Sequence, residues 1–280
     1  MFARNNWIYS NIKQRMVNPT LDLSVYLDLK DVKIENIKFE DACNMTAYQI
    51  KKDYSDKKIY ISFSGGMDSE NIIRVFHRNN IEFYPIIVVC NDNRQELKYA
   101  FKTCFELKLK PIILKMSDKH LQEIVFIDIL NKLKGVGIYS AQHIFASRYV
   151  NYQKGILVNG AEMLVNTEGT IFNIPIGLLD VEIYTYALLS NTSISIPFYF
   201  YTPQIFYSYV RSIDETSNET IQQFKSTLYN IENRIKYRPI YNDRLLKMML
   251  EISNINKKIS KNYCILGSKS EVIRMFENKK

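Results

Sequence analysis

The segment from Lys58 to Ser69, KIYISFSGGMDS, constrains the fold more than any other part of the chain. Residues 59–63 are apolar, β-branched and aromatic, which predicts a buried β-strand, and residues 69–80 follow with helical character. Between them, Gly65 and Gly66 let backbone N–H groups turn towards a ligand, and the next helix adds its unpaired N–H groups and positive dipole end. The pattern predicts an anion-binding loop; the alternative is a tight turn with Ser69 as the helix N-cap.

Apolar and helical stretches alternate on both sides of this loop. A helix is expected at 39–54, and residues 83–89 are almost continuously apolar, as in a parallel strand covered on both faces. The alternation predicts an α/β fold, a doubly wound parallel sheet of five strands. Further elements are expected at 94–107 (helix), 111–116 (strand), 119–134 (helix), 140–152 (helix) and 155–159 (strand).

Three regions are expected along the chain. Residues 1–54 form an N-terminal cap and a leading helix, 55–175 form the α/β core that contains the two glycines, and 176–280 form a helical C-terminal region for substrate or partner contacts. The cap contains β-like runs at 7–9 and 32–34, and the core ends in a hairpin at 165–172. Within the C-terminal region, helices are expected at 180–189 and 203–210 and over 214–280, the last with breaks near 238–239 and 262. The aromatic run at 196–203 is assigned to the same helical region.

The hexapeptide from Ser64 to Ser69 resembles the SGGxDS motif of the PP-loop ATP pyrophosphatases, the superfamily that includes asparagine synthetase, argininosuccinate synthetase, GMP synthetase, NAD synthetase and 7-cyano-7-deazaguanine synthase. It is not a Walker A loop, because the glycines are adjacent and no Lys-Ser or Lys-Thr follows. The resemblance is specific over 59–116 and absent from 1–40 and 181–280. It implies an adenine nucleotide alpha hydrolase-like sheet with strand order 3-2-1-4-5.

The resemblance also implies roles for the loop residues. The amides of Gly65 and Gly66 and the hydroxyls of Ser64 and Ser69 would bind the β and γ phosphates of ATP, Asp68 and Ser69 would be catalytic, and Asp68 would hold Mg²⁺, a cation that prefers carboxylate and phosphate oxygens. The end of the second strand would frame adenine and ribose. That role would fall to the backbone of Val88, Val89 and Cys90, and Asn91 and Asp92 could reach ribose, metal or substrate. The alternative for 91–93 is a helix N-cap.

A second glycine follows the strand expected at 155–159. By resemblance, Gly160 would approach the pyrophosphate and Glu162 would be a further metal ligand, although the longer Gly-x-Gly and Asp-Glu pattern of asparagine synthetases is absent. The alternative is a simple turn at the strand end. Because ligands bind at the carboxyl ends of parallel strands, residues 64–69, 90–92 and 160–162 are expected to line one cleft.

The activity implied by the resemblance is AMP-forming. An acceptor oxygen would attack the α phosphorus of ATP, pyrophosphate would leave, and a nitrogen nucleophile would then displace AMP, as in asparagine synthetase or 7-cyano-7-deazaguanine synthase. The first alternative is a sulfur-transfer or tRNA or DNA base-modifying enzyme. Phosphoadenylyl-sulfate reductases, however, usually have Lys where Met67 stands, and Cys264 lacks their acidic-Cys-Gly context. The second alternative is a nucleotide-binding module without catalysis.

Charge and composition add limits. The net charge of +8 suits polyanionic partners, ATP and nucleic acid included, but the lysines are scattered. No stretch reaches the ~18 apolar residues of a membrane span, no signal peptide is evident, and the four widely spaced cysteines suggest neither zinc nor disulfides. A cytoplasmic protein is expected, and a homo-oligomer is compatible with the sequence. Basic residues that could face the nucleotide are Arg211, Lys225, Arg234, Lys236 and Arg238.

Overall fold

The computed structural model describes most of the expected core and parts of both ends of the chain. The described residues are 7–10, 14, 25–90, 93–124, 140–160, 165–167, 171–173, 175–177, 195–213, 220–234, 263–265 and 269–277. Asn91, Asp92 and Glu162 lie outside these ranges, as does the helix expected at 180–189. The roles suggested for these three residues therefore stay predictions.

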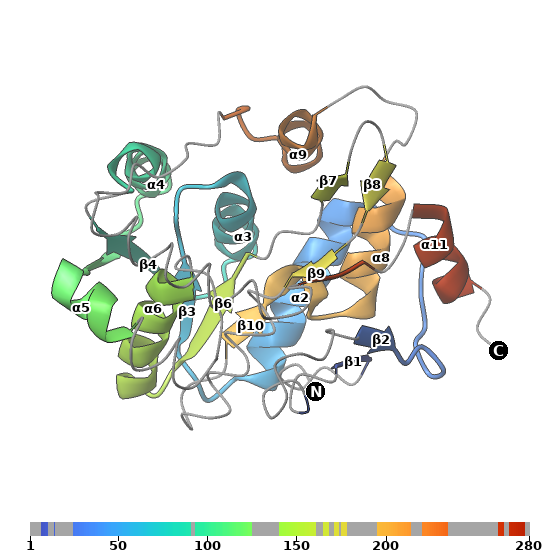
Figure 1. Cartoon of the computed structure of the whole chain (residues 1–280), viewed down its shortest axis with the longest axis horizontal. Coiled ribbons are helices and arrows are strands. Elements are labelled where there is room, and N and C mark those ends of the chain that lie inside the picture. Colours follow the sequence, from blue (N-terminus) through green and yellow to red (C-terminus); the bar gives the residue numbers. More distant parts are fainter. Residues whose placement is uncertain are drawn as a thin grey trace.

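A parallel sheet of five strands forms the centre of the molecule (Figure 1). Its strand order is β10-β6-β3-β4-β5, and every neighbouring pair is parallel. Numbered along the chain, this is the predicted order 3-2-1-4-5, with the strand before the glycines in the middle. The strands are β3 (Ile59–Ser62), β4 (Tyr84–Val89), β5 (Ile112–Lys115), β6 (Ile156–Asn159) and β10 (Ser195–Pro197).

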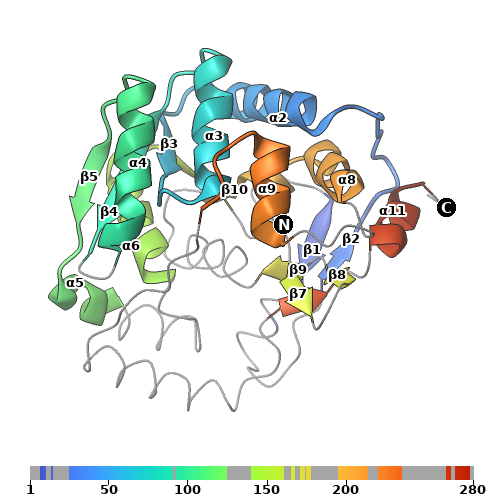
Figure 2. The same ribbon diagram turned by 90° about the horizontal axis from the view of Figure 1, so that it is seen from above.

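Helices cover both faces of this sheet (Figure 2). Successive side chains of a strand point to opposite faces, and the two hydrophobic clusters separate accordingly. Ile59 and Ile61 pack with residues of α3 (Met67–Arg78) and α4 (Arg94–Glu106), whereas Tyr60 packs with residues of α6 (Ser140–Tyr152). Both faces are therefore buried, which explains why β3 and β4 are apolar almost throughout.

Several of the remaining described helices lie on the α3 side of the sheet. Helix α2 contacts both α3 and α8, and α9 packs on α3 (Figure 2). These helices are α2 (Phe39–Asp53), α8 (Pro203–Ser212), α9 (Ile221–Tyr229) and α11 (Lys269–Glu277). The smaller elements are β1 (Ile8–Ser10), β2 (Val25–Leu27), α5 (Asp118–Glu123), β7 (Val165–Thr167), β8 (Ile171–Asn173), β9 (Pro175–Gly177), the 3₁₀ turn η2 (Phe198–Phe200) and β11 (Tyr263–Ile265).

Three expectations about secondary structure are wrong. The start of the aromatic run at 196–203 belongs to the sheet as β10 rather than to a helical region, and an edge position of this kind tolerates Pro197 at the strand end. Residues 263–265, directly after the break expected near residue 262, form β11 and pair with β9 instead of resuming a helix. Residues 32–34 form no strand, because β1 pairs with β2 instead.

Two other expectations are met as far as the described residues reach. The hairpin expected at 165–172 is present as the antiparallel pair β7 and β8, and α5 covers the start of the helix expected at 119–134. In the part of the chain that the structure describes, no helix has the length and apolar character needed to cross a membrane.

Candidate functional site

Residues 64–69, here called the glycine loop, leave the carboxyl end of the central strand and enter α3. Gly65 has a φ of 88°, in the left-handed region that glycine adopts without strain. A Cβ at Gly65 would stand 2.4 Å from the carbonyl oxygen of Glu96 in α4, so a side chain has no room there. Gly66 is the N-cap of α3, and a Cβ there would meet only the Ser64 hydroxyl, at 3.3 Å. The first glycine therefore sets the loop conformation, and the second leaves the backbone open to an approaching group.

Two serine hydroxyls line the inside of the loop. Ser69 Oγ donates to the carbonyl oxygen of Gly66 at 2.9 Å, so the contact of 3.3 Å between the two hydroxyls must have Ser64 as its donor. The amide of Gly66 donates to Ser64 Oγ at 3.2 Å. Ser64 and Gly66 are exposed, whereas Ser69 is buried. Together with the unpaired N–H groups of the first turn of α3, this arrangement can receive an anion.

Gly160 lies against the start of α3, as predicted from the parallel sheet. A Cβ on this glycine would stand 3.1 Å from Asp68 Cβ and 3.2 Å from the amide nitrogen of Ser69. Strands β3 and β6 are parallel neighbours, so Gly160 and the glycine loop leave the sheet at the same edge. The structure thus brings Gly160 to the loop, while Glu162 is outside the described residues.

One asparagine side chain forms hydrogen bonds with the backbone at the end of β4. The Asn93 side chain accepts from the Cys90 amide at 3.1 Å and donates to the Val88 carbonyl at 2.7 Å. The Val89 carbonyl accepts from the amide of Met116 at 2.9 Å. Asn93 occupies the N-cap position of α4, yet its side chain makes no cap hydrogen bond to the helix. Three of the backbone groups at this strand end, the Val88 and Val89 carbonyls and the Cys90 amide, therefore bind partners within the protein.

Asp68 receives hydrogen bonds from helix α9, far away in the sequence. Lys225 Nζ donates to Asp68 Oδ2 at 2.7 Å, and the Tyr229 hydroxyl donates to Asp68 Oδ1 at 2.8 Å. A third residue, Tyr199, donates to the backbone carbonyl of Asp68 at 2.8 Å. The Lys225 side chain is only 2% exposed, whereas that of Asp68 is 24% exposed. Both carboxylate oxygens thus accept hydrogen bonds from the protein, while part of the Asp68 side chain remains exposed to solvent.

The two tyrosines remain protonated donors. Their rings stack with centroids 6.0 Å apart and an interplanar angle of 5°. Burial first, and then the negative charge of Asp68, raises the pKa of Tyr229 well above its ordinary value, and the same two causes raise the pKa of Tyr199. Each hydroxyl therefore keeps its proton at neutral pH and can continue to donate to Asp68.

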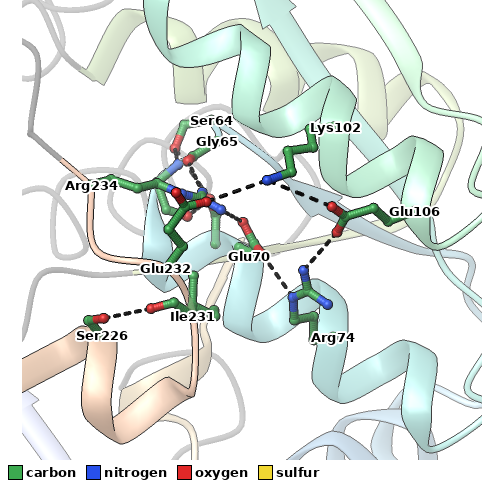
Figure 3. A network of polar contacts seen from close by, with 12 residues as sticks. Ser64, Gly65, Glu70, Arg74, Lys102, Glu106, Ser226, Ile231, Glu232 and Arg234 are labelled. Atoms are coloured by element: carbon green, nitrogen blue, oxygen red, sulfur yellow. Dashed lines mark hydrogen bonds and ion pairs between the residues drawn. The ribbon is translucent and has the colours of Figure 1, made fainter.

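A second cation from the C-terminal region reaches the glycine loop. Arg234 Nη1 donates to the carbonyl oxygen of Gly65 at 2.6 Å, and Nη2 binds the carboxylate of Glu70 (Figure 3). The guanidinium lies over the ring of Tyr99, with Cζ 4.3 Å from the ring centroid. The loop is thus bordered by two cationic side chains, Lys225 and Arg234.

These two side chains were among five basic residues that the sequence could not rank. Arg211 instead stacks on Tyr207, with Cζ 5.7 Å from the ring centroid. Lys236 and Arg238 lie outside the described residues. The contribution of Tyr199 and Tyr229 had no sequence signal, because an isolated tyrosine in an aromatic-rich chain ordinarily indicates packing.

Asp68 suits a magnesium ion that arrives together with phosphates better than a resident metal. Both carboxylate oxygens already accept hydrogen bonds, and the described residues contain no cluster of three His, Cys, Asp or Glu side chains that could hold a metal. Mg²⁺ is typically bound through one or two carboxylates, with substrate phosphates and water completing its octahedron. The partly exposed Asp68 carboxylate could provide one such ligand.

Comparison with known proteins gives only distant likenesses. No protein-family model and no curated protein sequence matches the chain. Among solved structures, NMN synthetase from Francisella tularensis is 11% identical, with 80% of this chain and 96% of that chain covered and a TM-score of 0.36. A predicted subunit of tRNA methyltransferase from Methanocaldococcus jannaschii is 14% identical, with 77% and 99% covered and a TM-score of 0.37. NH3-dependent NAD synthetase from Campylobacter jejuni is 17% identical, with 55% and 74% covered and a TM-score of 0.33. Likenesses this distant assign no function to the chain.

Proposed function

We propose that the chain binds ATP at the glycine loop and transfers the adenylyl group to an acceptor oxygen, releasing pyrophosphate. The observation that carries this proposal is the loop itself. It joins the central parallel strand to a helix N-terminus, with Gly65 in a left-handed conformation and the Ser64 and Ser69 hydroxyls inside. Backbone amides, hydroxyls and the helix dipole in this arrangement favour phosphate groups.

The chemistry requires no side-chain nucleophile. The acceptor oxygen forms a new bond to the α phosphorus, and the bond between that phosphorus and the oxygen bridging to the β phosphate breaks, so that pyrophosphate leaves. A nitrogen nucleophile then attacks the acceptor carbon that bears the adenylated oxygen, the bond between that carbon and the oxygen breaks, and AMP leaves with the oxygen. The glycine loop would hold the β and γ phosphates, and Lys225 and Arg234 would offset negative charge near the leaving group. Mg²⁺, when bound by the phosphates and Asp68, would add further charge neutralisation.

The test is pyrophosphate release from ATP with a panel of carboxylate, amide and nucleobase acceptors and with ammonia present. Asp68→Asn is the informative variant, because it removes the charge while keeping a carbonyl oxygen that can accept from Tyr229. Asp53→Asn is a matched control, since Asp53 is the last residue of α2, where it accepts from Gln49 and Tyr201. We expect turnover in the wild type and in Asp53→Asn, and a loss of at least tenfold in Asp68→Asn.

A second candidate is a nucleotide-binding module without turnover. The observation that favours it is the engagement of both Asp68 oxygens by Lys225 and Tyr229, which competes with a metal role. Binding of ATP with no pyrophosphate formed with any acceptor would favour this candidate over the first. If the folded protein binds no ATP, both candidates fail. Base modification of tRNA or DNA rests on the net charge alone and is the weakest of the three proposals.

A further inference from the structure

We propose that Arg234 is a positioning residue that fixes the Gly65–Gly66 peptide of the glycine loop in the orientation needed to receive a phosphate. This inference rests on the proposed function, since it concerns the same loop, but it assigns to Arg234 a task that acts through backbone geometry. Its guanidinium touches the carbonyl oxygen of Gly65 at 2.6 Å. Direct contact with the nucleotide is not part of the proposal.

Several neighbouring groups hold the Arg234 guanidinium in one orientation. Its side chain is 9% exposed, and Glu70, its acidic partner, is 1% exposed. Among the described residues, Arg234 Nε is buried without a hydrogen-bond partner, so the orientation of the group is set by its two terminal nitrogens and by the Tyr99 ring below it. A planar guanidinium can donate to a carbonyl and to a carboxylate and stack on an aromatic ring at the same time, which a lysine ammonium cannot.

The orientation of the Gly65 carbonyl determines where the next amide points. A peptide unit is planar, so fixing the carbonyl oxygen of Gly65 fixes the N–H of Gly66 in the opposite direction. That N–H points into the loop, towards Ser64 Oγ at 3.2 Å. Glycine at φ 88° has no side chain to resist a rotation of this peptide. Arg234 therefore supplies the restraint that the glycine itself lacks.

The turn after α9 brings Arg234 to the loop. Asn230 ends the helix in the left-handed conformation, with φ 53°, and Ser226 Oγ donates to the carbonyl of Ile231 at 2.7 Å. Figure 3 shows this turn beside the charged side chains of α3 and α4. Glu232, in the same segment, is 3.4 Å from Lys102 of α4. The segment that carries Arg234 is thus tied both to its own helix and to α4.

Glu70 connects Arg234 to a second arginine that does not touch the loop. Arg74 Nε donates to Glu70 Oε1 at 2.8 Å, and Arg74 Nη2 is 3.2 Å from Glu106 (Figure 3). Arg74 and Arg234 therefore share one buried carboxylate, but only Arg234 binds the glycine loop. The chain in this way offers a matched pair: loss of either arginine disturbs Glu70, and loss of Arg234 alone releases the Gly65 carbonyl.

The experiment compares Arg234→Met, Arg234→Lys and Arg74→Met in the full chain. Binding of α,β-methylene-ATP and of adenosine is measured by calorimetry, and amide hydrogen exchange is followed over residues 64–69 without ligand. We expect Arg234→Met to weaken the analogue by about tenfold or more, because a hydrogen bond from a charged group is lost, and to change adenosine binding by less than about twofold. Arg234→Lys should recover only part of the affinity. Arg74→Met should keep wild-type exchange in the loop.

Equal effects of Arg234→Met and Arg74→Met on analogue binding and on loop exchange would overturn the inference and leave Arg234 a purely structural residue. If Arg234→Met does not fold, the comparison of Arg234→Lys with Arg74→Lys carries the test. If the wild type binds neither the analogue nor adenosine, the proposed function fails. The exchange rates of the loop amides still decide whether Arg234 holds the peptide in place.

Discussion

The ammonium nitrogen of Lys225 lies 2.7 Å from Asp68 Oδ2, across 157 residues of sequence. The two partners differ in their access to water: 2% of the Lys225 side chain is exposed, against 24% of the Asp68 side chain. An ion pair of this kind costs desolvation energy that its own attraction must offset. The free energy of unfolding that is lost when the pair is broken therefore depends on which partner is removed.

Removal of Asp68 should destabilise the fold more than removal of Lys225. Asp68→Ala leaves a buried ammonium without a counter-ion, which costs about 3–5 kcal/mol in comparable sites. Lys225→Met leaves a carboxylate that Tyr229 still serves and water can reach, so we expect roughly 1–2 kcal/mol. Urea unfolding of the two variants at pH 7 measures the difference. A larger loss for Lys225→Met would contradict this asymmetry, because methionine keeps the aliphatic packing of the lysine and removes only its charge.

The two adjacent glycines should respond differently to the same substitution. At Gly65, alanine meets both a positive φ of 88° and the Glu96 carbonyl at 2.4 Å, so Gly65→Ala should cost at least about 2 kcal/mol of stability. At Gly66, φ is −73° and the nearest atom is the end of the Ser64 side chain, so Gly66→Ala should change stability by less than about 0.5 kcal/mol.

Thermal and urea unfolding of both glycine variants, followed by ATP-analogue binding, separates the two roles. If the exposed backbone at Gly66 is the surface that a phosphate approaches, Gly66→Ala should fold normally and bind the analogue several-fold more weakly. Normal stability of Gly65→Ala would contradict the backbone geometry described for the loop.

The core of the fold could be predicted from local patterns. The strand ending at Ser62, the glycine loop and α3 follow one another along the chain with no gap. Strands β4 and β6 each lie in a nearly continuous apolar run. Because the sheet is parallel and β3 is central, the position of Gly160 beside the glycine loop followed from topology and is confirmed. These elements could be predicted because each one depends on the residue pattern of a single short segment.

The remainder of the site depends on contacts that no short segment encodes. Lys225 and Arg234 are ordinary basic residues in helical sequence until α9 packs on α3. The edge strand β10 has three residues and ends in proline, too little for a periodic signal. Tyr199, just after it, reaches Asp68 only because β10 joins the sheet beside β6. These features arise from tertiary packing, which overrides local propensity.

Magnesium should bind the protein mainly in the presence of nucleotide. Both oxygens of Asp68 accept hydrogen bonds from the protein, so the carboxylate alone is a poor ligand until phosphates add oxygen donors. Calorimetry should show weak Mg²⁺ uptake by the protein alone and stronger uptake with the ATP analogue, reduced in Asp68→Asn. Tight uptake without nucleotide that survives Asp68→Asn would place a metal site elsewhere in the chain.

The stability of the fold should fall as the pH drops below neutral, partly because of His143. Burial lowers the pKa of His143 to about 4, and its Nδ1 is buried without a hydrogen-bond partner among the described residues. A folded-state pKa below the unfolded value of about 6.5 means that the unfolded chain binds the proton first as the pH falls.

Because the pKa of His143 is lowered in the folded state, its effect on stability can be measured only in a defined pH range. Above pH 6.5 the ring is neutral in both states and contributes nothing, whereas between pH 6.5 and 4 protonation favours the unfolded chain. At pH 5 the loss should be about 2 kcal/mol relative to pH 7. His143→Gln, which cannot titrate, should show a shallower decline over the same interval in urea unfolding. Because Asp and Glu side chains titrate mainly below pH 5, the difference between the two proteins at pH 5 to 6.5 isolates the histidine. Identical declines would mean that the ring is solvated and titrates in the folded state as it does in the unfolded chain.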